Sequence, residues 1–212
     1  MKRPGVAEGC ALVCWLALQL AALAIAACRI PLDARPPIAG EQWALGLMVA
    51  LQMLAGALLS PLLLARGKWT IAAIAAGWPM AALSSFLADA STTQAMMAEL
   101  FVSVWLLTLH LCVRDEHRMQ QLWVACVAAL LCAAGPILMY VNHDFADAPS
   151  PIMDHAARLS PLMSAIAQTI DPRWSRCGMI LIALALIATG RAAISFVKTG
   201  KIRTPKFSSE FR

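Results

Sequence analysis

Six stretches of the sequence are apolar over about the length that a helix needs to cross a bilayer, which is roughly 20 residues. These stretches are residues 9–28, 43–65, 71–88, 95–113, 122–141 and 178–197. In lipid a helix satisfies its backbone polar groups internally, so each stretch fits a membrane-spanning helix. The sequence therefore predicts an all-α fold: a polytopic transmembrane helix bundle with about six spans, forming a single integral membrane domain over residues 1–212.

Composition excludes the main soluble alternatives. The chain is 60% hydrophobic and only 14% charged, whereas a soluble domain has roughly 45–50% apolar and about 25% charged residues. So few charges cannot cover the surface of a protein this size in water. An ordinary soluble enzyme, a disordered regulator and a nucleic-acid-binding module are excluded, and the lipid bilayer is the expected surrounding.

The basic residues set the expected orientation. With the N-terminus in the cytoplasm, twelve of the 17 Lys and Arg residues fall on the inner side and five fall outside. Because cytoplasmic loops carry an excess of Lys and Arg, both termini are predicted to be cytoplasmic. The basic tail, residues 198–212, should then lie on the inner leaflet. We expect an integral multi-pass protein of the bacterial cytoplasmic (inner) membrane.

The first span has a second interpretation. Lys2 and Arg3, an apolar run and then Cys28 resemble a lipoprotein signal peptide that is cleaved at the cysteine, which would leave five spans. Glu8 is unusual in the basic start of such a signal, and a lipoprotein is rarely polytopic. A retained first helix is the favoured interpretation.

Prolines interrupt two of the spans. Gly77 and Pro79 lie inside the third span, and Gly135 and Pro136 lie inside the fifth. A proline removes one backbone hydrogen bond and clashes with the preceding turn, so a kink is expected at each. These kinks are candidate hinges.

The longest connection is the outer loop, residues 142–177. Apolar residues recur in its second half at spacings of mostly three and four, from Ile152 to Ile170, which predicts one or two short amphipathic helices on or in the membrane surface. Ser160 before Pro161 has the pattern of an N-cap followed by proline at the first helical position.

Few side chains suggest chemistry. Glu99 is the only acidic residue well inside a span, where a charge normally faces a cavity or a partner. It lies near the outer end of the fourth span, so an acid at the interface or at the start of the helix is the favoured interpretation, with a transport path or proton relay as the alternative. Four outer residues could join His143 in a metal site, although a solvated loop is favoured; they are Asp144, Asp147, Asp154 and His155.

The sequence contains none of the common enzyme signatures. A nucleophile elbow, an H-E-x-x-H helix and a dinucleotide-binding glycine pattern are all missing, and no two histidines sit at matched depth for a haem. We therefore expect no catalytic, cofactor-binding or metal-binding residues and no nucleic-acid partner.

The layout resembles the permeases of ABC-2-type exporters. Three short segments are similar in sequence to that family: LLSPL at 58–62 followed by GKW at 67–69, LSSFL at 83–87, and LSPL at 159–162. The resemblance implies six spans, short helices before the last span, an ATPase partner and a second permease copy. The chain departs from the family in two places, because only eight residues precede the first span and the loop at 66–70 is very short. Those regions grip the ATPase in the family, so a shortened relative without ATP coupling is a second interpretation.

These observations lead to two main functional hypotheses. The first is a permease-like transmembrane subunit of an ABC-2-type export complex, without catalytic activity of its own. Its candidate transport path or gate comprises Glu99, Pro79, Pro136, Ser160 and Pro161. The alternative is a non-catalytic assembly or scaffold subunit of a larger, oligomeric membrane complex. A membrane enzyme that uses Glu99 or the outer His and Asp residues is the least favoured hypothesis.

Overall fold

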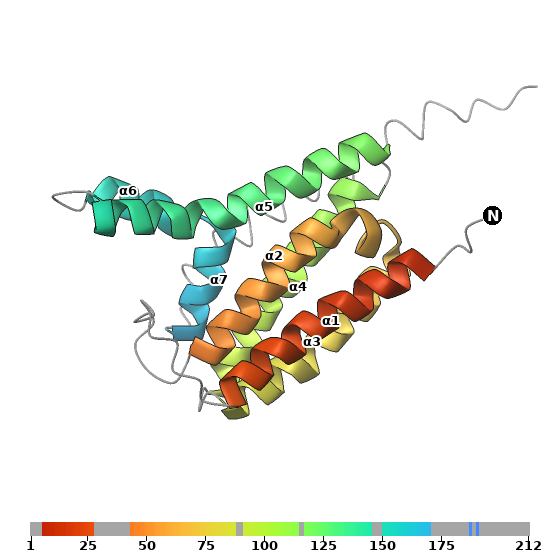
Figure 1. The fold of residues 1–212 in the computed structure, drawn as a ribbon, viewed down its shortest axis with the longest axis horizontal. Helices are drawn as coiled ribbons and strands as arrows, with labels where there is room; N and C mark the ends of the chain where they lie inside the picture. Colours follow the sequence, from red (N-terminus) through yellow and green to blue (C-terminus); the bar gives the residue numbers. More distant parts are fainter. Residues whose placement is uncertain are drawn as a thin grey trace, which may run out of the picture.

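The computed structural model describes residues 6–27, 43–87, 91–114, 117–145 and 150–170, together with residues 187 and 190. Seven α-helices and one π-helical turn make up this part of the chain (Figure 1). Their bounds are α1 Val6–Ala27, α2 Trp43–Leu63, α3 Gly67–Leu87, α4 Thr92–Val113, α5 Arg118–Tyr140, η1 Val141–Phe145, α6 Pro151–Arg158 and α7 Pro161–Ile170.

The first five helices are long and apolar enough to cross a membrane. They correspond to the first five predicted spans, and they indicate an integral multi-pass membrane protein. The predicted sixth span, residues 178–197, falls almost entirely outside the described residues, as do the basic tail and Cys28. The third span is one continuous helix from Gly67 to Leu87 that includes Pro79.

Helix α2 lies at the centre of the molecule and packs against α1, α3, α4, α5 and α7. Two indole groups reach it from opposite neighbours. Trp15 Nε1 of α1 donates to the carbonyl of Gln52 at 3.2 Å, and Trp105 Nε1 of α4 donates to the next carbonyl, that of Met53, at 3.4 Å. A buried indole needs an acceptor, and these two bonds fix the register of α1 and α4 against α2.

Two tryptophans lie inside predicted spans, and they differ in burial. Trp105 is 4% exposed and packs between helices. Trp78 is 37% exposed on α3. Sequence hydrophobicity alone cannot tell a helix face that meets another helix from one that meets lipid, because both are apolar.

Polar contacts tie the helix ends together at the side that the sequence predicts to be cytoplasmic. The turn between α2 and α3 spans only residues 64–66, and Arg66 pairs with Glu8 of α1 at 3.1 Å. On the same turn, the carbonyl of Leu64 is hydrogen-bonded by His110 Nδ1 near the end of α4. This turn is therefore short and held by both neighbouring helices.

The outer loop forms two short helices, α6 and α7, as its periodicity predicts; we call this pair the hairpin. Helix α6 packs against α5, and α7 packs against α2, α4 and α5. In Figure 1, α5 crosses one side of the bundle, α6 runs alongside its far end, and α7 turns from there down towards α2. The two short helices thus connect the end of α5 to the centre of the bundle.

Candidate functional site

Three polar side chains meet inside the bundle, each from a different helix. Gln52 Nε2 of α2 donates to Gln19 Oε1 of α1 at 3.1 Å and to Glu99 Oε2 of α4 at 3.2 Å. Gln19 Nε2 in turn donates to the carbonyl of Trp15 at 3.5 Å. All three side chains are fully buried. We call this group the polar cluster.

The position of Glu99 differs from the favoured sequence interpretation. Helix α4 begins at Thr92, so Glu99 lies about two turns inside the helix, and it is 0% exposed. Glu99 is therefore a buried residue within the helix and not an acid at its start. The interpretation failed because the helix begins three residues before the predicted apolar run, which moves Glu99 further from the end.

The fourth side of the polar cluster is the backbone of α3 at Gly77. A Cβ added to Gly77 would overlap Glu99 Oε1 and would lie 3.0 Å from Glu99 Cδ. The missing side chain thus makes room for the carboxyl group between α3 and α4, which pack closely along their length. Pro79 lies two residues further along the same helix, about half a turn away, and is exposed on its surface.

Two oxygen atoms of the polar cluster lack a donor. Within the described part of the chain, Glu99 Oε1 and Gln52 Oε1 are both buried and have no hydrogen-bond partner. Buried acceptors are nearly always paired in native structures, so unpaired ones call for a physical explanation.

Sequence reasoning missed Gln19 and Gln52. The search for candidate residues followed charge and histidine, and an uncharged amide does not lower the apolar character of a span enough to stand out. A usable signal existed, because Gln19 and Gln52 are the only amide side chains in the first two spans. A side-chain amide in mid-span needs hydrogen-bond partners from another helix.

A second set of contacts joins α5 to the hairpin at Pro136. Proline cannot donate to the carbonyl four residues earlier, which is that of Cys132. The hydroxyl of Ser160, just before α7, lies 3.2 Å from this carbonyl and 3.0 Å from that of Leu131. Ser160 therefore supplies a donor where the proline removes one. It does not cap α7 with its side chain as the sequence pattern predicted, because its hydroxyl is turned towards α5.

Gly135 allows this close approach. A Cβ at Gly135 would lie 2.5 Å from Ser160 Cβ, 2.6 Å from Met163 Cγ and 2.8 Å from the carbonyl oxygen of Ala157. No larger residue fits without moving the hairpin. The structure thus brings together three of the five predicted path or gate residues, Pro136, Ser160 and Pro161, while Glu99 and Pro79 lie elsewhere in the bundle.

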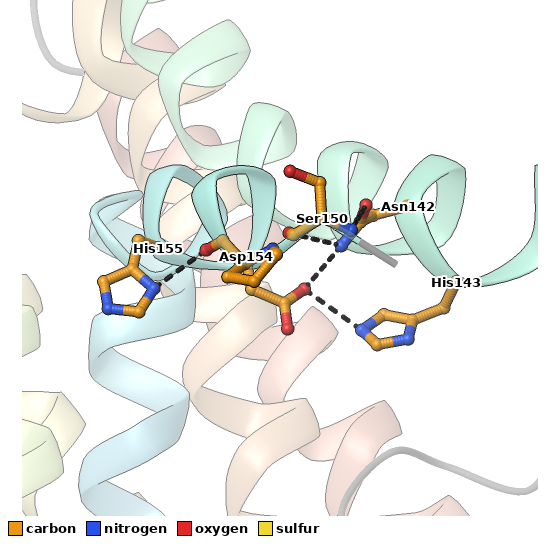
Figure 2. A network of polar contacts seen from close by, with 6 residues as sticks. Asn142, His143, Ser150, Asp154 and His155 are labelled. Carbon is orange, nitrogen blue, oxygen red and sulfur yellow. Dashed lines mark hydrogen bonds and ion pairs between the residues drawn. The ribbon is translucent and has the colours of Figure 1, made fainter. Parts of the chain in front are cut away.

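A third group of contacts holds the start of α6 against the end of α5 (Figure 2). The buried amide of Asn142 donates to the carbonyl of Ser150 at 3.0 Å and to Asp154 Oδ1 at 2.8 Å, and it accepts from the Ser150 N–H at 2.8 Å. The hydrogen bond from Asn142, helped by the nearby His143 and Arg158, lowers the pKa of Asp154 below its usual value. One amide thus anchors the hairpin at its outer end.

The outer residues named as an alternative metal site are only partly brought together. His143 Nε2 lies 3.1 Å from Asp154 Oδ1, whereas His155 turns away and contacts the carbonyl of Pro151 (Figure 2). Asp147 lies outside the described residues. Among the residues that the structure describes, no group of three potential metal ligands converges.

Comparison of the chain with family models, with curated proteins and with solved structures gave no match. The functional argument therefore depends on the geometry above and on the residues themselves.

Proposed function

We propose that this chain is a permease-like transmembrane subunit of an ABC-2-type export complex, with no catalytic activity of its own. The observation that carries the proposal is the helical hairpin α6–α7, which follows the fifth long helix, precedes the last apolar run and packs on α2, α4 and α5. A short helical segment at this place is what the resemblance in layout implies. In this proposal the chain has six spans with both termini in the cytoplasm of a bacterial cell.

The hairpin would act as the gate. It is held to α5 at two places, by Ser160 on the carbonyls beside Pro136 and by Asn142 on the start of α6. These hydrogen bonds can break and reform at a modest cost of about 1 kcal/mol each, while Leu162 and Ala165 of α7 pack in the apolar core of the bundle. The proline is then the natural hinge, because α5 already lacks one helical bond there.

Energy would come from a separate ATPase subunit, and a second permease copy would complete the path. The exposed apolar face of α5 supports a contact with lipid or with another chain; its large exposed side chains include Trp123, Val127, Leu130, Leu131 and Ile137.

One observation favours the alternative of a scaffold subunit. The turn between α2 and α3 has only three residues and is occupied by contacts to Glu8 and His110. A turn this short offers little backbone for an ATPase to grip. If the chain does not couple to ATP hydrolysis, it would serve to assemble a larger membrane complex.

Purification in mild detergent from the native membrane, followed by identification of the co-eluting chains, separates these functions. The transporter proposal expects an ATPase in fixed proportion to the chain. Recovery of respiratory or secretion subunits without an ATPase would contradict it and would favour the scaffold.

A variant pair then tests the gate. Ser160→Ala should reduce export by the complex while the ATPase stays bound. The matched control is Ser85→Ala, because Ser85 donates only to the carbonyl of Ala82 within its own helix, at 2.8 Å. Equal export by both variants would contradict the role of the hairpin.

A further inference from the structure

We propose that the polar cluster is a proton-binding site: the Glu99 carboxyl group holds one proton inside the bundle, where α2, α3 and α4 meet. The inference is independent of the export proposal, because it concerns only contacts within this chain.

The first argument is the balance of donors and acceptors. Gln52 Nε2 uses both of its N–H groups, one on Gln19 Oε1 and one on Glu99 Oε2. Gln19 Nε2 donates one of its two N–H groups to the carbonyl of Trp15. The buried oxygens without a partner, Glu99 Oε1 and Gln52 Oε1, are both acceptors as the residues stand. An ionised carboxylate adds only acceptors to this group, whereas a protonated one adds an O–H donor.

The second argument is charge. Among the described residues, no Lys, Arg or His contacts Glu99, whose one side-chain partner is the neutral amide of Gln52. The other described glutamate in the bundle, Glu8, lies at a helix start and pairs with Arg66 at 3.1 Å. A lone charge in the middle of a membrane helix is disfavoured about 100-fold on insertion scales, so a neutral carboxyl group is expected at Glu99.

The third argument is space, and it distinguishes a proton from a metal ion. Glu99 Oε1 lies against the backbone of Gly77 so closely that even a methyl group there would overlap it. Hard cations take about six or more oxygen ligands, and only two oxygens of the cluster are unengaged. A proton needs neither extra ligands nor extra volume.

The site also links the proton to helix packing. If the proton leaves, a negative charge remains at the contact between α3 and α4, next to Gly77. A buried charge needs water or a cation to stabilise it. Because Glu99 is fully buried against Gly77, either would enter as the two helices separate. Occupancy of the site and closure of this helix pair are therefore coupled.

Labelling with dicyclohexylcarbodiimide tests the inference on the full-length chain in lipid nanodiscs at neutral pH. This apolar reagent adds to protonated carboxyl groups within membranes: the acid proton moves to a nitrogen of the reagent and the carboxyl oxygen bonds to its central carbon. Peptide mass spectrometry then locates the adduct. We expect adduct at Glu99 in more than about tenfold excess over Glu8, the ion-paired control in the same molecule.

A second measurement covers the case in which the reagent cannot reach the site. Infrared spectra of the native chain should show the carbonyl band of a neutral carboxylic acid, and this band should be missing in Glu99→Gln but present in Glu8→Gln. Native-chain labelling needs no variant, so it remains decisive even if Glu99→Gln does not fold.

Two results would overturn the proposal. The first is neither adduct at Glu99 nor a neutral-acid band in the native chain, which would mean that the carboxyl group is ionised. The second is strong suppression of labelling by sodium chloride but not by choline chloride, which would assign the site to a metal ion. Neither result depends on an ATPase or an export assay, so the outcome is separate from that of the proposed function.

Discussion

At the scale of single residues, Gly77 is the position at which the smallest change should have the largest effect. An added methyl group overlaps Glu99 Oε1, so Gly77→Ala must displace the carboxyl group from the polar cluster. Overpacking of this kind costs roughly 1–3 kcal/mol. We expect a lower midpoint of thermal unfolding in detergent for this variant.

The matched control for Gly77→Ala is Gly9→Ala in α1. A Cβ there lies 3.8 Å from Trp69, an ordinary contact, so the midpoint should stay or rise. In a Glu99→Ala background there is no carboxyl group to displace. Gly77→Ala should therefore lower the midpoint of unfolding less in that background than in the native chain. Equal midpoints for the two glycine variants would show that Glu99 does not occupy the space above Gly77.

Asp154 should make the attachment of α6 depend on pH. Its pKa is lower in the folded protein than its usual value near 3.8, chiefly because Asn142 donates to it. A lowered pKa means that the carboxylate stabilises the folded contact at pH values above about 4, and that this stabilisation is lost as the pH falls through the folded pKa. We expect the amides of α6 to exchange faster, relative to those of α5, below about pH 4.

Asp154→Asn is the control for this effect. It keeps an oxygen that can accept from Asn142 but removes the titration, so the ratio of exchange rates between α6 and α5 should be flat over the same range. A ratio that changes equally in both proteins would assign the pH dependence to another group.

The residues also show where sequence reasoning ends. Glu99 could be selected from its type and its place in a span. That Glu99 pairs with Gln52, and Gln52 with Gln19, could not be predicted, because these pairs are 47 and 33 positions apart in the sequence. Which faces of four helices meet is a property of packing, and uniformly apolar helices give no periodic signal for it.

At the scale of elements, the junction of α5 with the hairpin should depend on Pro136 and Ser160 together. Ser160→Ala leaves the Cys132 carbonyl without its donor and should cost about 1–3 kcal/mol. In a Pro136→Ala background, the new backbone N–H can serve that carbonyl, so the same serine change should cost less. A double-mutant cycle of unfolding free energies measures this coupling.

Additive effects in the cycle would contradict the pairing of proline and serine. Ser85→Ala serves again as the control, because its hydroxyl is exposed and bonds within its own turn. In the control cycle, the effects of Ser85→Ala and Pro136→Ala on the unfolding free energy should add without coupling.

The elements themselves were largely predictable. Five spans and the two short outer helices follow from apolar length and from spacing, because each depends on local sequence. The role of Ser160 was not, because the N-cap pattern describes only the local helix. In this structure a carbonyl in α5, freed by a proline 24 positions earlier, competes for the same hydroxyl.

At the scale of the whole molecule, the orientation in the membrane is the property to test. The turn with Arg66 and Lys68 should face the cytoplasm, and α6 should face outwards. In a variant without native cysteines, an impermeant maleimide should label His155→Cys on intact cells and Lys68→Cys only after permeabilisation. Both positions are exposed, so labelling depends on the side of the membrane at which each cysteine lies. The reverse labelling pattern would contradict the predicted orientation.

The central place of α2 has a consequence for biogenesis. Gln52 contacts Gln19, which is translated 33 residues earlier, and Glu99, which is translated 47 residues later. The first two helices can thus enter the bilayer as a pair whose amides already satisfy one another. In that order of insertion, Glu99 enters a bilayer that already holds its hydrogen-bond partner, so the cost of placing an acid in lipid is lowered.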